Sequence, residues 1–175
     1  MMRWRVDSKT RRVAVVGMLG GAAAALSLVE RLAPLPLPVP GFKLGLSNIA
    51  VIAAFEVAGP LGGAAVALIK ILISLLLSGN WIAFTLSLSG TLLSYIAIFT
   101  LSRFPRDTFS CAGVGAASAA SHAAGQIIAA AALTSSGAVF AWLPPLMLLS
   151  TGAGILTGMM LNLVRRRVSL NGESE

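Results

Sequence analysis

The stretch ALIKILISLLLSGN, residues 67–80, decides the class of this protein because it sets one lysine into an otherwise apolar run of helical length. Over the whole chain, hydrophobic residues make up 57% and charged residues 11%, and the mean hydropathy is +0.88. Soluble domains contain about 45–50% apolar and about 25% charged residues. The composition therefore indicates an integral membrane protein, and its continuous apolar runs favour helices over the alternating strands of a β-barrel.

Six apolar segments can be drawn along the chain, against the roughly 20 residues that a helix needs to cross a bilayer core. They cover residues 13–32, 44–58, 61–78, 82–102, 111–133 and 142–164. The sequence thus predicts an all-α, polytopic membrane protein in which residues 13–164 form one bundle of six transmembrane helices. Residues 1–12 are predicted to be a basic cytoplasmic tail, and residues 165–175 a second cytoplasmic tail.

The positions of lysine and arginine predict the orientation, because cytoplasmic flanks carry an excess of both. With the N-terminus inside, ten basic residues flank the segments on the cytoplasmic side, and only Arg31 and Lys43 flank them on the outer side. The bias and the even number of segments place both termini in the cytoplasm, in a multi-pass protein of the cytoplasmic (inner) membrane. The net charge of +7 follows from this pattern, so we expect no nucleic-acid partner.

Two segments carry polar side chains at membrane depth, where an unpaired ionisable group is costly. Lys70 lies about nine residues into its segment, roughly 13 Å from the inner end. It is predicted to face a polar pocket, with a snorkelling or structural lysine as the alternative. His122 and Gln126 are four residues apart and therefore share one helical face. A histidine satisfied within the protein core is the alternative to a ligand-binding histidine.

A second group of polar residues lies at the outer mouth, in PGFKLGLSN at 40–48. Here Lys43 lies at the mouth while Ser47 and Asn48 enter the second segment, with a helix-capping loop and an interfacial lysine as the alternative. Together with Lys70, His122 and Gln126 they are predicted to line one cavity open to the outside. Two lysines favour a small anionic or strongly hydrogen-bonding organic solute. The predicted substrate-binding residues are Lys43, Asn48, Lys70, Ser89, His122 and Gln126.

The sequence lacks the motifs that several kinds of activity require. The chain has no G-x-x-x-x-G-K-[ST] loop for ATP, so we expect a partner or an ion gradient to energise any transport. Its two aspartates, Asp7 and Asp107, flank membrane segments and cannot form the magnesium-binding carboxylate cluster of diphosphate chemistry. One histidine and one cysteine, Cys111, give no metal-ligand spacing and no internal disulfide. We expect no catalytic residue, metal or cofactor.

Small residues are dense in the first and fifth segments, as in GMLGGAAAA at 17–25. Gly17, Gly21 and Ala25 lie on one face of the first helix. Small-xxx-small spacing allows close helix approach. The face is therefore predicted to pack either within the bundle or against a partner protein.

Four strings resemble a known family: PGFKLGLSNIAV (40–51), LSGNWIAFTLSLSGTLLS (77–94), SHAAGQ (121–126) and LPPLMLLSTGAGILTG (143–158). They are similar to the bacterial Gx transporter family, often labelled heptaprenyl diphosphate synthase component I, over roughly residues 13–164. That family is in turn similar to the S components of energy-coupling factor transporters. This resemblance implies a six-helix, S-component-like bundle that captures a solute from outside.

The resemblance also implies partners. S components work with a transmembrane coupling protein and two ATPases, and they dock through small residues of the first helix, here Gly17, Gly21 and Ala25. We therefore expect a substrate-binding transporter subunit in the lipid bilayer. One alternative is the membrane subunit of a heptaprenyl diphosphate synthase, and another is a non-catalytic scaffold of a redox or biosynthetic assembly.

Overall fold

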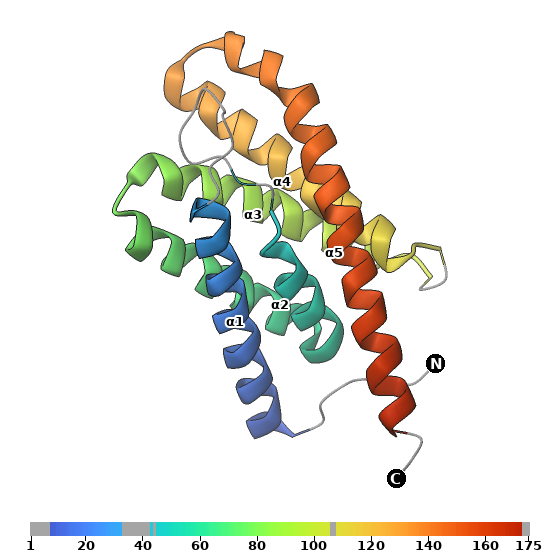
Figure 1. The fold of residues 1–175 in the computed structure, drawn as a ribbon. Helices are drawn as coiled ribbons and strands as arrows, with labels where there is room; N and C mark the ends of the chain where they lie inside the picture. The colour runs from blue at the N-terminus through green and yellow to red at the C-terminus, as the bar shows by residue number, and fades with distance from the viewer. Residues whose placement is uncertain (1–7, 33–42, 44, 106–107, 173–175) are drawn as a thin grey trace.

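The computed structural model describes residues 8–32, 43, 45–105 and 108–172, and all regular secondary structure in these ranges is helical (Figure 1). Five helices are long and apolar enough to cross a membrane. The chain order is α1 (Lys9–Leu32), α2 (Asn48–Ser78), α3 (Trp81–Leu101), α4 (Cys111–Thr134), the short 3-10 helix η1 (Gly137–Trp142) and α5 (Leu143–Gly172).

The predicted number of six transmembrane helices is corrected to five, because the second and third apolar segments form the single element α2. Gly59 interrupts α2 with φ 80° and ψ −174°, a conformation that essentially only glycine adopts, and Pro60 begins the second half. The first half, Asn48–Ala58, has about 11 residues and rises roughly 16 Å, which is too short to cross a bilayer core.

The two halves of α2 fold back on each other. Lys70 Nζ donates a hydrogen bond to Asn48 Oδ1 at 2.6 Å, although the residues are 22 apart in sequence. A continuous helix would separate them by roughly 33 Å. Tyr95 of α3 holds the reversal by donating its hydroxyl to the Pro60 carbonyl at 2.8 Å. The AGPLGG stretch is therefore the tight turn that the sequence predicts.

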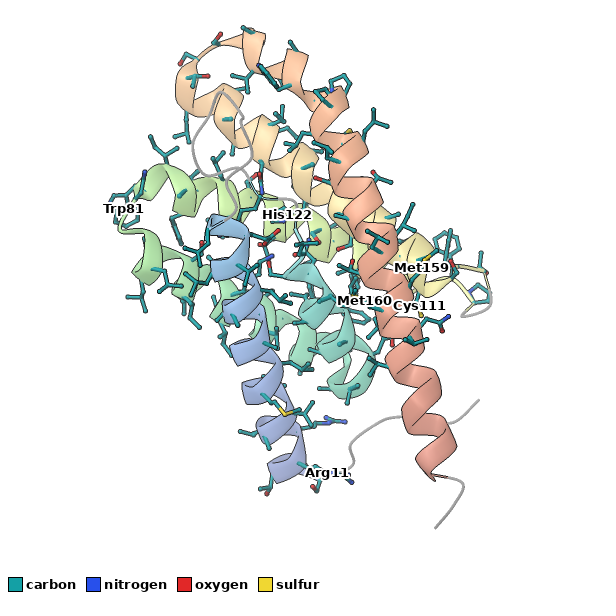
Figure 2. All side chains as sticks on the ribbon, viewed as in Figure 1. Arg11, Trp81, Cys111, His122, Met159 and Met160 are labelled. Atoms are coloured by element: carbon teal, nitrogen blue, oxygen red, sulfur yellow. The ribbon has the colours of Figure 1, made fainter. Side chains whose placement is uncertain are left out.

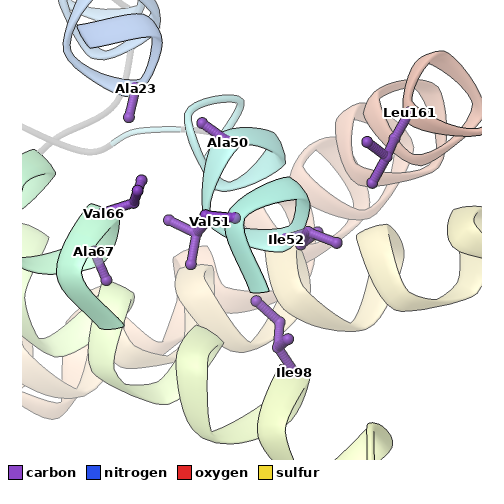
Figure 3. Close-up of a cluster of buried hydrophobic side chains, with 9 residues drawn as sticks. Ala23, Ala50, Val51, Ile52, Val66, Ala67, Ile98 and Leu161 are labelled. Atoms are coloured by element: carbon purple, nitrogen blue, oxygen red, sulfur yellow. The ribbon is translucent and has the colours of Figure 1, made fainter. Parts of the chain in front are cut away.

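The apolar core gathers around this folded-back helix. Figure 3 shows side chains of both α2 halves, among them Val51 and Val66, meeting Ala23 of α1, Ile98 of α3 and Leu161 of α5. All of these side chains are buried. The core therefore fixes where the polar residues at the start and end of α2 lie relative to α1 and α3.

Glycines set the close crossings of the later helices. A Cβ at Gly115 of α4 would collide with the Gly154 carbonyl of α5, and one at Gly125 would lie 2.6 Å from the Ser89 carbonyl of α3. The small residues of the predicted fifth segment therefore pack within the protein, because only glycine permits these approaches.

The helices at the two ends of the chain lie at the periphery. Among the described elements α1 packs against α2 alone, and α5 packs mainly against α4. Figure 1 shows the Lys9 end of α1 and the Gly172 end of α5 at the same end of the molecule. Helix α1 begins inside the predicted tail 1–12, and α5 continues into the predicted tail 165–175.

Candidate substrate-binding site

Two polar residues of α1 face the bundle. Ser27 and Glu30 are three residues apart and continue the buried face of Ala23. The Glu30 carboxylate accepts the Leu46 backbone N–H at 2.8 Å and the Ser47 hydroxyl at 3.2 Å. Because these groups open α2, the carboxylate lies at the positive end of that helix, which favours a negative charge.

Lys43 is only 4% exposed and is held at both its side chain and its backbone. Its Nζ donates to Ser27 Oγ at 3.0 Å and to Ser74 Oγ at 2.8 Å. Its backbone N–H donates to Gln126 Oε1 at 3.0 Å, and its carbonyl accepts from Gln126 Nε2 at 3.2 Å. The Gln126 amide thus ties the segment before α2 to α4.

We call Ser27, Glu30, Lys43, Ser74 and Gln126 the satisfied cluster. Each member makes at least one hydrogen bond to another part of the chain. These bonds join α1, the Lys43 segment, the second half of α2 and α4. The satisfied cluster is therefore well placed to hold the fold together around the start and the end of α2.

A second group lies next to it. Lys70 and His122 are 0% exposed, and Asn48 is 3% exposed. Lys70 donates to Asn48 Oδ1, but Asn48 Nδ2 and both ring nitrogens of His122 have no hydrogen-bond partner among the described residues. We call Asn48, Lys70 and His122 the unsatisfied cluster. Such buried orphan groups are rare and costly in folded proteins.

The His122 ring is enclosed by two glycines and lies near the centre of the bundle in Figure 2. A Cβ on Gly45 would be 3.4 Å from His122 Cδ2, and one on Gly90 would be 2.9 Å from His122 Nδ1. The Gly90 backbone therefore lies directly beside the ring. Neither ring nitrogen has a hydrogen-bond partner among the described residues, so both are available to a ligand.

Charges of both signs surround this group. Glu30 and Lys43 are the charged residues whose fields act on Lys70, and Lys70 and Lys43 act on His122. The sequence places no acidic residue within ten positions of Lys70, so the proximity of Glu30 is a finding of the fold.

Helix α3 adds hydroxyl groups along its buried face. Ser94 and Ser118 of α4 share a hydrogen bond of 2.8 Å, whereas Ser87 Oγ and Thr91 Oγ1 find no partner in the described ranges. Ser89, a predicted substrate-binding residue, is only half-buried, and its hydroxyl donates to the Gly125 carbonyl at 2.8 Å. Ser89 therefore links α3 to α4 and stands apart from both clusters.

The predicted site residues thus fall into separate groups. Lys43, Asn48, Lys70, His122 and Gln126 are brought together, as expected, but Lys43 and Gln126 belong to the satisfied cluster. Three contributors were not predicted at the site: Ser27, Glu30 and Ser74. The 3/4 spacing of Ala23, Ser27 and Glu30 on one face of α1 was the signal that could have indicated two of them.

The small-residue face of α1 remains uncovered. Gly17, Gly21 and Ala25 are exposed, and a Cβ on either glycine would meet nothing within 4 Å. Among the described residues, no group of three His, Cys, Asp or Glu side chains could hold a metal ion.

Comparison with protein families identifies the chain. The family model for heptaprenyl diphosphate synthase component I matches residues 19–164. This chain belongs to that family. The matched range includes every residue of both clusters, all of α2, α3 and α4, and the larger part of α1 and α5. Searches of curated proteins and of solved structures find no match.

Proposed function

We propose that the protein is the membrane-embedded, substrate-binding subunit of an energy-coupling-factor-like transporter for a small organic solute. The observation that carries this proposal is the unsatisfied cluster, in which three nitrogen atoms of buried Asn48 and His122 have no hydrogen-bond partner among the described residues. A solute with complementary groups would satisfy these atoms and recover the free energy that their desolvation costs.

The buried state of the site agrees with a binding subunit that encloses its solute. All members of both clusters are less than 10% exposed. Entry and release therefore require part of the protein to move. Lys43 is tied to α4 through Gln126, so an opening at the segment before α2 would have to break these two hydrogen bonds.

In the proposed topology the first half of α2 enters the membrane without crossing it, and the second half returns to the side on which α2 began. Both termini would lie in the cytoplasm of a cell with this protein in its inner membrane. The exposed face of Gly17, Gly21 and Ala25 would dock on a transmembrane coupling protein, and two ATPases in trans would supply the energy. No ATP-binding loop occurs in the sequence.

The family name favours a second function, a membrane subunit of a heptaprenyl diphosphate synthase. In that case Lys43 and Lys70 would hold a diphosphate while a soluble partner rich in aspartate performs the chemistry. The satisfied bonds of Lys43 and the single carboxylate near Lys70 give this function less support. The synthase function, unlike the transporter function, predicts that prenyl-transfer activity disappears when this chain is removed.

Mass spectrometry of small molecules that co-purify with the protein tests the proposed function. The wild-type protein, purified in mild detergent, is expected to retain a solute whose uptake by cells depends on this chain. Loss of prenyl transfer without any effect on solute uptake in a deletion strain would contradict the proposal and support the synthase function.

A further inference from the structure

We propose that the solute is a monocarboxylate, and that its carboxylate binds between Lys70 Nζ and Asn48 Nδ2 with the His122 ring beside it. This inference rests on the proposed function and specifies its ligand. It is carried by the buried geometry of three side chains, which come from the two halves of α2 and from α4.

The orientation of the Asn48 amide follows from its partner. An ammonium group only donates hydrogen bonds, so the atom that receives the 2.6 Å bond from Lys70 must be the amide oxygen. The amide nitrogen then faces away from the Lys70 bond, and it has no acceptor among the described residues. Lys70 Nζ and Asn48 Nδ2 are therefore two neighbouring donors, which suits the two oxygens of one carboxylate.

The His122 ring lies within reach of the same place. A Cβ on Gly45 would be 3.1 Å from Asn48 Nδ2 and 3.4 Å from His122 Cδ2. The free amide and the imidazole edge thus both border Gly45. Imidazole Nε2 can donate to a carboxylate oxygen or accept from a polar group farther along the solute.

The charge of the site limits the charge of the ligand. The buried charged residues in the described part of the chain are Glu30, Lys43 and Lys70. In their ordinary ionisation states they leave one positive charge in excess, and a buried unpaired charge is unfavourable. One carboxylate neutralises this excess. A diphosphate would bring more negative charge than the buried groups can compensate, because the site offers no carboxylate cluster that could hold magnesium.

A panel of small probes tests the ligand class directly. Thermal unfolding of the purified chain in lipid nanodiscs is measured with butyrate, with butyramide as its uncharged counterpart, and with inorganic diphosphate at equal ionic strength. Lys70→Met removes the proposed donor, and Ser89→Ala serves as the control, since Ser89 bonds only to Gly125 in the described structure. Butyrate is expected to raise the unfolding midpoint of the wild type and of Ser89→Ala but not of Lys70→Met. Butyramide should bind about tenfold more weakly or worse.

Each of the remaining outcomes would contradict the carboxylate ligand, and each has a different consequence for the proposed transporter function. Equal stabilisation by butyramide would mean that the charge is not recognised, and a binding subunit would remain. Stabilisation by diphosphate alone, dependent on Lys70, would also support the synthase function. No shift with any probe would exclude a carboxylate site, whereas the proposed function would still be decided by the co-purifying solute.

Discussion

The satisfied and unsatisfied clusters lie side by side around the start of α2, yet they differ in how their polar groups are used. Gln126 makes two hydrogen bonds to the backbone of Lys43, and Glu30 accepts two from the start of α2. Four positions along α4 from Gln126, His122 is equally buried, but neither of its ring nitrogens has a described partner. Buried polar groups of the first kind stabilise a fold, and those of the second kind destabilise it until a ligand arrives.

This difference separates two roles, stabilising the fold and binding the solute, that the sequence pattern does not distinguish. Both clusters contain a lysine and an amide, so residue type alone does not distinguish them. The number of protein partners does. We therefore expect substitutions in the satisfied cluster to change the stability of the protein, and those in the unsatisfied cluster to change solute binding.

The largest effect is expected for Gln126→Met, which keeps the side-chain volume but removes both bonds to Lys43. An unpaired buried donor and acceptor each cost about 1–3 kcal/mol, so we expect a loss of about 2–6 kcal/mol in the free energy of unfolding. Denaturant or thermal unfolding in detergent measures it. A variant as stable as the wild type would show that the amide is not a structural link.

His122→Leu should act in the opposite way. It replaces a buried imidazole that has no described hydrogen-bond partner, so the free energy of unfolding is expected to stay the same or rise. Binding of the co-purifying solute should weaken about tenfold, the equivalent of about 1.4 kcal/mol. Calorimetric titration of the identified solute provides the measurement, and unchanged affinity would remove His122 from the site.

Ser89→Ala is expected to have a smaller effect. It removes one hydrogen bond between α3 and α4, and such bonds between membrane helices contribute about 0.6 kcal/mol on average. Solute affinity should remain within about twofold of the wild type. A large loss of affinity with normal stability would return Ser89 to the binding residues, as the sequence analysis predicted.

Gly21→Ala should have the smallest effect on the isolated protein. A Cβ at this position meets nothing within 4 Å, and alanine favours a helix over glycine by about 1 kcal/mol at most. Stability and solute affinity should therefore be nearly unchanged. Co-purification with a coupling protein should fall if this face of α1 docks there, and an unaltered complex would argue against that role.

Local features of the chain were predictable from the sequence, and long-range pairings were not. Gly59-Pro60 and Gly79-Asn80 mark turns through their own backbone preferences, and the structure has a reversal at the first and helix caps at the second. The four-residue spacing of His122 and Gln126 also predicted that they share one face of a helix, which is α4. Their different roles depend on Lys43, which is 83 residues from Gln126.

Two corrections have the same cause. The first half of α2 looked like a separate transmembrane helix because its composition is apolar, but its length is limited by the reversal at Gly59. Glu30 was left out of the predicted site because its partners, Leu46 and Ser47, are 16 and 17 residues away in the sequence. Helical periodicity carries no information about contacts across that distance.

The most direct test of the central distinction compares Lys70→Met with Gln126→Met in two measurements, the unfolding midpoint and the amount of solute retained per folded protein. Removing Lys70 leaves Glu30 and Lys43 with one buried charge of each sign, but it also leaves Asn48 Oδ1 without its donor. We therefore expect Lys70→Met to lose about 1–3 kcal/mol of unfolding free energy, less than Gln126→Met, and to lose the solute. Gln126→Met should unfold at a clearly lower temperature. If Lys70→Met were destabilised as strongly as Gln126→Met and its folded fraction still retained the solute, the account of two separate clusters would be wrong.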